Sequence, residues 1–152
     1  MEIKYLQEAA VYDLCIQRIE QINAETTPQW GKMDAAQMFE HCAEVQEVLN
    51  GSKALSRTPF VIRLLGPIIK KAVLSTKPYP KSSQTHPQYI IRSEQDFQTA
   101  KHRLIASLDA FRQMSPAEAL AVKHPIFGKM DQKDKGWAGY KHLDHHLRQF
   151  GV

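Results

Sequence analysis

Three of the seven histidines stand close together near the C-terminus, in residues 137–150, a stretch with a helical pattern. His142 and His146 are four residues apart, so a helix places both rings on one face, one turn apart. Two imidazoles at this spacing can bind one metal ion. On a helical wheel His146 falls within the apolar arc and His142 borders it, whereas His145 points away from it. The pattern therefore favours the pair His142 and His146 over the adjacent pair.

A third histidine, His41, lies inside the apolar arc of another predicted helix. A single inward histidine can be an ordinary core residue with satisfied ring nitrogens, and that alternative applies to His41 alone. The stacked pair His142 and His146 is harder to explain in this way, because four ring nitrogens would need partners in the core. Taken together, the three histidines predict a divalent-metal site.

Three histidine ligands leave a coordination position open, which is typical of catalytic rather than structural sites. Nitrogen ligands favour zinc or nickel, with iron and copper as alternatives, and a bound water could be deprotonated near neutral pH. Gln37 lies one turn before His41 and Gln149 lies three residues after His146, so either side chain could orient a bound ligand. Glu44, three residues after His41, could be a general base or could face solvent.

The remaining histidines are expected at the surface. His86 and His124 each precede a proline in a predicted loop, and His102 lies off the apolar stripe of its helix. His124 is of most interest, because its loop leads into the last helix.

Four long amphipathic helices are predicted to position these residues. The expected ranges are 3–22, 34–50, a helix capped by Ser93 whose apolar stripe ends at Phe111, and 131–150. Asp34 with Gln37 forms a capping box, and Asp131 is the cap of the last helix. The tetrapeptide Gly-Lys-Met-Asp precedes both histidine-bearing helices, which indicates the same entry turn used twice. Lys141, Asp144 and Arg148 are expected on the solvent side of the last helix.

The segment 52–92 is the least regular part of the chain. Residues 59–74 predict one kinked helix or two short ones around Pro67, which could lie on a membrane surface or, as we favour, cover one end of a bundle. Residues 76–88 are expected to form a loop. The prediction is an all-α, single-domain four-helix bundle over residues 1–152, with a long crossover-type connection that carries a short extra helix.

Composition excludes several classes of protein. The net charge is +4 and the basic residues are spread along the sequence, so no nucleic-acid partner is expected. Cys15 and Cys42 form no metal-binding pair or disulfide framework and are expected to be buried in a reducing compartment. No signal peptide and no apolar run of about 20 residues is visible, so we expect a cytoplasmic protein without membrane insertion.

Two stretches of the chain resemble the DinB-like superfamily. Trp30 and Asp34-Ala-Ala-Gln-Met-Phe-Glu-His41 resemble its second helix. His124-Pro-x-Phe-Gly-Lys-Met, Trp137 and His142-x-Asp-His-His-Leu-x-Gln-Phe150 resemble its last helix, in an uncharacterised branch of the superfamily that ends in this motif.

The resemblance implies a four-helix bundle, often a homodimer, with a divalent metal on three histidines that correspond to His41, His142 and His146. The superfamily includes enzymes that transfer low-molecular-weight thiols to small molecules, and here that chemistry is an analogy. The metal would then bind a cofactor sulfur as thiolate, which attacks a small electrophilic substrate. The alternatives are a metal-dependent hydrolase and a metal-stabilised, non-enzymatic binding or stress-response module.

Overall fold

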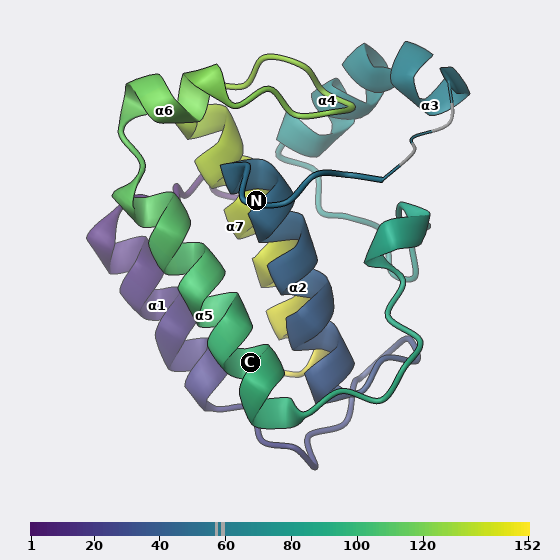
Figure 1. The fold of residues 1–152 in the computed structure, drawn as a ribbon. Coiled ribbons are helices and arrows are strands. Elements are labelled where there is room, and N and C mark those ends of the chain that lie inside the picture. The colour runs from purple at the N-terminus through teal and green to yellow at the C-terminus, as the bar shows by residue number, and fades with distance from the viewer. Residues whose placement is uncertain (57, 59) are drawn as a thin grey trace.

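The computed structural model describes residues 1–56, 58 and 60–152, and this part of the chain is helical without a β-strand (Figure 1). The all-α prediction is therefore confirmed. The four long helices are α1 (Ala9–Glu20), α2 (Ala35–Asn50), α5 (Phe97–Gln113) and α7 (Gln132–Gln149). The short helices are α3 (Phe60–Leu64), α4 (Gly66–Leu74), α6 (Pro116–Ala121) and the 3-10 turn η1 (Pro87–Tyr89).

The two histidine-bearing helices begin with the same turn, as the repeated tetrapeptide predicted. Gly31 and Gly128 both adopt positive φ, +85° and +67°, which glycine tolerates without a steric penalty. Asp34 and Asp131 then take an extended conformation and cap α2 and α7, each accepting a hydrogen bond from the backbone N–H three residues later. In α2 the Gln37 side chain completes the predicted capping box.

Two helix starts differ from the sequence prediction. α1 begins at Ala9 instead of residue 3, and the Leu6 backbone N–H donates to the Gly136 carbonyl of α7 instead of to its own helix. α5 begins at Phe97 with Asp96 as its cap, so Ser93 is not the cap. Asp96 accepts from the Thr99 N–H at 2.8 Å, which satisfies an otherwise unpaired donor of the first turn.

The four long helices enclose one apolar core, and α2 packs against both α5 and α7. α2 and α7 are antiparallel, since Gln46 of α2 donates to the Gly139 carbonyl while the later Leu49 packs near the earlier Ala138. α2 and α5 run in the same direction. The ring of Phe39 lies 5.5 Å from that of Phe97 near the start of both helices. The Asn50 side chain donates to the Ser107 carbonyl further along both.

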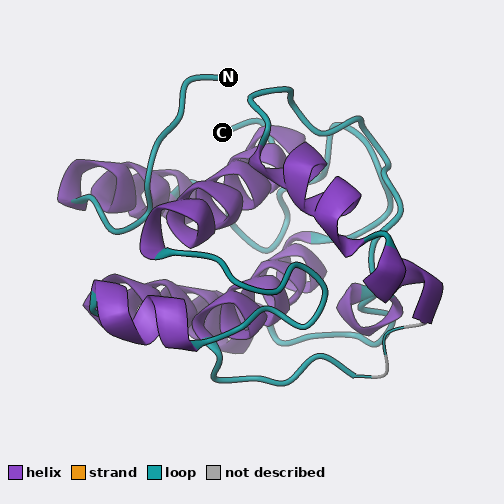
Figure 2. Cartoon of the chain, turned by 90° about the horizontal axis from the view of Figure 1, so that it is seen from above, coloured by secondary structure: helices purple, strands orange, loops and turns teal. Residues whose placement is uncertain are grey.

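Because α2 and α5 are parallel, the chain must return along the length of the bundle after α2 before α5 can begin. Residues 52–92 form this return. The extra helix expected at 59–74 consists of α3 and α4, which end and begin on either side of Leu65, while position 59 of that prediction lies outside the described residues. Figure 2 shows the short helices of this connection gathered at one side of the bundle. The connection thus covers one flank of α2 and α7.

This cover corrects one expectation for the last helix. Lys141 and Asp144 are buried, with exposed fractions of 1% and 2%, whereas Arg148 is exposed as expected. The Lys141 ammonium donates to the carbonyls of Ala72, Val73 and Ser75 at 2.8–3.2 Å, and the end of α4 therefore lies over it. Asp144 pairs with Arg18 of α1 at 2.8 Å. Both polar residues are buried because their charges have partners.

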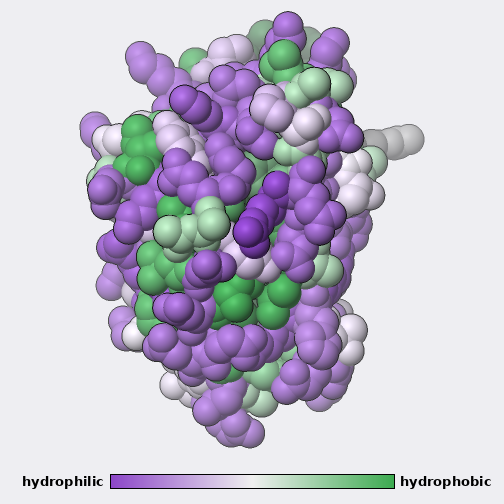
Figure 3. Space-filling view, turned by 90° about the vertical axis from the view of Figure 1, so that its left-hand side faces the viewer, coloured by the Kyte–Doolittle hydropathy of each residue, from purple (hydrophilic) through white to green (hydrophobic). Residues whose placement is uncertain are grey.

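Within the described residues, no helix is both long enough and apolar enough to cross a bilayer. The face opposite the connection carries hydrophilic side chains around smaller hydrophobic areas (Figure 3).

Candidate metal centre

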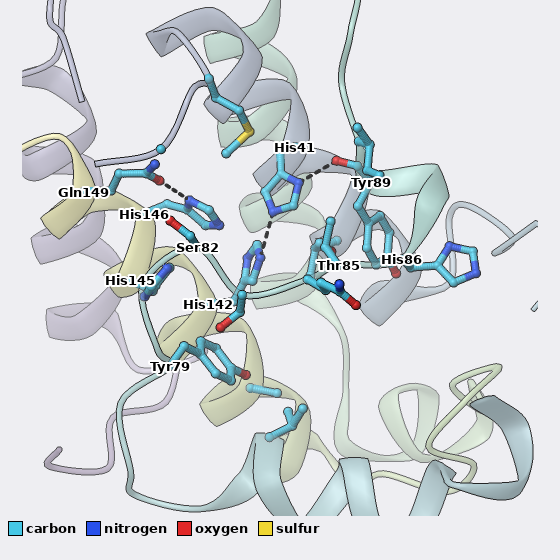
Figure 4. Close-up of a pocket in the computed structure, with 18 of the residues that line it drawn as sticks. His41, Tyr79, Ser82, Thr85, His86, Tyr89, His142, His145, His146 and Gln149 are labelled. Carbon is cyan, nitrogen blue, oxygen red and sulfur yellow. Dashed lines mark hydrogen bonds between the residues drawn. The ribbon is translucent and has the colours of Figure 1, made fainter. Parts of the chain in front are cut away.

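Three histidine rings meet where α2 crosses α7 (Figure 4). One ring nitrogen from each of His41, His142 and His146 lies within 4.8 Å of the others. The Nε2 atoms of His41 and His142 are 3.1 Å apart, although the residues are separated by 101 positions in the chain. The antiparallel packing of α2 and α7 positions the cluster, because His41 faces the turn of α7 that carries both other rings.

Hydrogen bonds fix the orientation of two of the rings. His41 Nδ1 lies 2.7 Å from the Tyr89 carbonyl oxygen, and His146 Nδ1 lies 2.8 Å from Oε1 of Gln149. Gln149 is itself held, because its Nε2 donates to the Trp30 carbonyl at 2.6 Å. Both acceptors are oxygens, so the Nδ1 atoms carry the protons and the Nε2 atoms present lone pairs. This is the arrangement that metal-binding histidines commonly adopt.

The environment keeps all three imidazoles neutral. Burial lowers the pKa of His41, even though the hydrogen bond to the Tyr89 carbonyl opposes this effect. Burial, followed by the nearby His41 ring, lowers the pKa of His146 to about 3. Burial, followed by the nearby rings of His146, His41 and His145, holds the pKa of His142 well below its ordinary value. Neutral imidazole is the form that binds a metal ion.

The donor set fits a divalent cation. Two nitrogens bound to one zinc ion at about 2.0–2.1 Å must lie within roughly 4 Å of each other, and the 3.1 Å separation of the His41 and His142 Nε2 atoms meets this condition. The Nδ1 atom of His142 is buried and has no partner among the described residues. This nitrogen is not the one that faces His41, and the convergence of one nitrogen from each of the three rings is the arrangement that a cation needs. The three side chains could therefore hold a metal ion.

The two glutamines suggested by the sequence lie in different places. Gln149 contacts His146 and lines the cavity beside the cluster. The Gln37 amide contacts the Asp34 N–H and the Ser93 carbonyl at the start of α2. The structure thus places Gln149 next to a candidate ligand and Gln37 in a helix cap.

Glu44 belongs to a separate group of charges on α2. It is 5% exposed, so it does not face solvent, and it contacts Lys53, Arg103 and Gln88. Burial alone would raise the pKa of Glu44, but hydrogen bonds from these three residues lower it below its ordinary value. A carboxylate stabilised in this way is a poor proton acceptor.

His145 lies beside the cluster without belonging to it. Its ring meets those of Trp30 and Tyr79 edge-on at 5.8 and 5.9 Å. It is only partly buried and also lines the cavity. The helical wheel therefore separated it correctly from His146, but Trp30 and Tyr79 pack against it and keep it from facing solvent freely.

The expectation that His86 and His124 are surface residues was wrong, whereas His102 is exposed as predicted. His86 Nδ1 accepts from the Gln88 N–H at 3.3 Å, and His124 Nδ1 accepts from the Ile126 N–H at 3.2 Å. Each ring folds back on its own turn and becomes buried there. Both residues line the same cavity as the cluster. The shared signal is a His-Pro dipeptide, in which the ring caps the turn that proline starts.

The cluster opens onto a cavity of about 980 Å³. Its floor follows α2 and α7, with His41, Val45 and Leu49 on one helix and Ala138 on the other. Ile62, Ile69 and Val73 of α3 and α4 form much of the opposite wall. Sequence reasoning missed this wall, as well as Tyr79 and Tyr89, because no periodic pattern links residues 52–92 to the histidines. Burial raises the pKa of Tyr79 to about 12, so its hydroxyl remains protonated.

Comparison with known proteins identifies the family of the chain without giving an activity. Residues 4–151 match the family described as protein of unknown function (DUF1569), and the chain belongs to that family. Neither a curated protein nor a solved structure matches the chain.

Proposed function

We propose that this member of the DUF1569 family binds one divalent metal ion through His41, His142 and His146 and is an enzyme acting on a small, largely apolar molecule. The observation that carries the proposal is the convergence of three neutral imidazoles at the wall of a large cavity. Three protein ligands leave a position for an exogenous group, and the cavity leads to that position. Zinc or nickel suits the all-nitrogen ligand set.

The chemistry we favour is transfer of a low-molecular-weight thiol to an electrophilic substrate, in keeping with the resemblance to the DinB-like superfamily. When bound, the metal would lower the pKa of a thiol at the open position and stabilise it as thiolate. The sulfur would then form a bond to an electrophilic carbon of the substrate, and the leaving group would depart with its bonding electrons or, in an addition, the substrate would take up the proton.

One feature of the cavity favours a thiol over water as the nucleophile. No Asp or Glu is among the described residues that line it. Activation of water in metal-dependent hydrolases commonly relies on a carboxylate as general base. A thiol, with a free pKa of about 8.5, ionises at a metal without such a base. A metal-bound water can also ionise near neutral pH, but no carboxylate among the described residues lines this cavity to return its proton to a leaving group.

The remaining residues of the site would orient the ligands and control water. The Tyr89 carbonyl and the Gln149 amide hold the protons of His41 and His146 on Nδ1. Ile69 and Val73 of α4 limit the access of water from that side. Lys32 lines the cavity and supplies a positive charge for an anionic group of the thiol.

The test is the metal content of purified variants. We expect His142→Ala to lose stoichiometric zinc or nickel and His145→Ala to retain it. Of these two residues, His142 contributes a nitrogen to the cluster and His145 does not. His145 is the matched control, since it is a histidine of the same helix and cavity. Equal metal content in the two variants would overturn the ligand assignment.

A further inference from the structure

The positive charge of the protein is concentrated in one segment. Residues 52–92 contain eight Lys and Arg residues and no Asp or Glu, while the rest of the chain has twelve basic and sixteen acidic residues. The net charge of +4 therefore arises entirely from the connection between α2 and α5. Among its described residues, the exposed basic side chains are those of Lys53, Arg63, Lys71, Lys77, Lys81 and Arg92.

The same segment exposes large apolar side chains. Five of them are 43–77% exposed and form what we call the outer face of α3–α4: Phe60, Val61, Leu64, Leu65 and Ile68. Phe60 and Leu64 are four residues apart, which brings both side chains to one side of α3, and Ile68 follows on the next helix, α4. An exposed group of large apolar residues usually marks an interaction surface.

The outer face is held firmly away from the bundle. Gly66 approaches the next layer so closely that a Cβ atom there would lie 2.2 Å from the Ile126 carbonyl oxygen. Lys70 donates to the Lys129 carbonyl and pairs with Asp134 at 3.2 Å, and Lys141 binds the last carbonyls of α4. These contacts fix the inner side of α4, so its exposed Ile68 side chain cannot turn inward without breaking them.

We propose that the outer face of α3–α4 docks onto an anionic lipid surface. An interfacial segment needs apolar side chains that enter the headgroup region, together with basic residues that are attracted to anionic lipids. This segment combines both features and has no acidic residue that the lipid would repel. The described helices include none that could span the bilayer, so the contact is peripheral.

Charge argues against a second copy of the chain on this face. A symmetric dimer would bring two segments of the same sign together, which is unfavourable. Docking on lipid also suits the position of α3–α4 over the cavity, since Ile62, Ile69 and Val73 line the cavity from the same two helices. An apolar molecule would then have a short path from the lipid to the cavity. The docking itself depends on no metal ion.

Co-sedimentation with vesicles tests the proposal on the full chain. We expect binding to phosphatidylcholine vesicles that contain phosphatidylserine, little binding to phosphatidylcholine alone, and weaker binding at high salt. The double variant Leu64→Glu/Ile68→Glu should bind the anionic vesicles at least about tenfold more weakly than wild type. Leu120→Glu is the matched control, because Leu120 is an exposed leucine on α6. Arg63→Gln/Lys71→Gln should reduce binding only to the anionic vesicles.

Circular dichroism and a cooperative thermal unfolding transition establish that each variant is folded. Failure of the wild-type chain to bind anionic vesicles, or unchanged binding by the double Glu variant, would overturn the proposal. The wild-type chain could instead form dimers in solution and not bind vesicles, while the double Glu variant is monomeric. That result would show that the outer face of α3–α4 contacts a second copy of the chain. Vesicle binding by His142→Ala separates this proposal from the metal assignment, because its loss of metal should leave docking unchanged.

Discussion

Two oxygen atoms determine how the histidine cluster can act. The Tyr89 carbonyl and the Gln149 amide each accept an Nδ1 proton, so His41 and His146 present their other nitrogens to the same space. The Gln149 amide is fixed in turn by its hydrogen bond to the Trp30 carbonyl. Gln149 therefore links the turn that precedes α2 to a candidate ligand on α7 through its side chain.

Substitution of Gln149 should weaken metal binding without removing it. Loss of such a supporting hydrogen bond typically reduces metal affinity by about 10–100-fold. We expect this reduction for Gln149→Ala, measured by competition with a chromogenic zinc chelator. Gln37→Ala is the control, because the Gln37 amide serves the cap of α2 and contacts no histidine of the cluster. An affinity that falls equally in both variants would contradict the role given to Gln149.

At the scale of single residues, the sequence could distinguish His145 from His146 but not locate His86 and His124. The first distinction depends only on helical periodicity. The burial of His86 and His124 depends on a turn in which Nδ1 accepts a backbone N–H two residues later, and on the cover supplied by distant segments. Neither factor has a periodic signal in the sequence.

The contact between α4 and α7 decides the form of the cavity. Lys141 of α7 binds three carbonyl oxygens at the end of α4, and the Trp137 indole donates to the Leu74 carbonyl at 3.0 Å. Burial lowers the pKa of Lys141, while the partial negative charge at a helix C-terminus favours a cation there. The cavity wall on this side is therefore fastened by polar contacts, in addition to the packing of Val73 and Leu74 against Leu49 and Ala138.

Lys141→Met should destabilise the protein by roughly 2–3 kcal/mol, because it removes a charged donor and leaves buried carbonyls without a partner. Chemical denaturation followed by circular dichroism measures this change. Lys133→Met is the matched control on the same helix, since Lys133 is exposed and should change stability by less than about 0.5 kcal/mol. If both variants unfold at the same denaturant concentration as wild type, Lys141 does not fasten α4.

The prediction that Lys141 and Asp144 face solvent was wrong, and the reason lies in the contacts between helices. A helical wheel describes one helix and assumes that its polar side faces water. α7 is contacted by α1, α2 and α4, so most of its circumference is covered. The two charged residues are compatible with burial because Arg18 and the end of α4 supply partners, and those partners are distant in the sequence.

For the whole molecule, the amphipathic stripes predicted the long helices and the length of the connection permitted a crossover. The direction of the helices could not be read from the stripes alone. It follows from contacts such as Phe39 with Phe97 and Asn50 with Ser107, which require α2 and α5 to be parallel. The capping residues Asp34 and Asp131 predicted where α2 and α7 begin, because a cap is a local signal in the sequence. The start of α1 was predicted too early, because the Leu6 N–H bonds to the distant Gly136 of α7.

Buried neutral histidines should also make the whole fold sensitive to acid. Burial, followed by the nearby Lys135 charge, lowers the pKa of His124 to about 4 from an ordinary value of about 6.5. Between these values the unfolded chain binds the proton and the folded chain does not, so stability falls as the pH falls from about 6.5 to about 4. The loss attributable to His124 is about 3 kcal/mol, at 1.36 kcal/mol per pKa unit.

The variant His124→Asn isolates this effect. Asparagine cannot titrate, and its side-chain oxygen can still accept the backbone N–H groups that His124 accepts. Between pH 7 and pH 4, measured with a chelator present, wild type should lose about 3 kcal/mol more unfolding free energy than the variant. His102→Asn should follow wild type, because His102 is exposed. Parallel curves for wild type and His124→Asn would contradict the buried neutral state of His124.

The most direct test of the metal site is a crystal structure of the zinc-loaded protein, with anomalous data collected on both sides of the zinc absorption edge. We expect one anomalous peak within bonding distance, about 2.0–2.1 Å, of nitrogens from His41, His142 and His146, at a position open toward the cavity lined by Val73 and Tyr79. A peak held by other residues, or its absence from crystals grown with excess zinc, would contradict it.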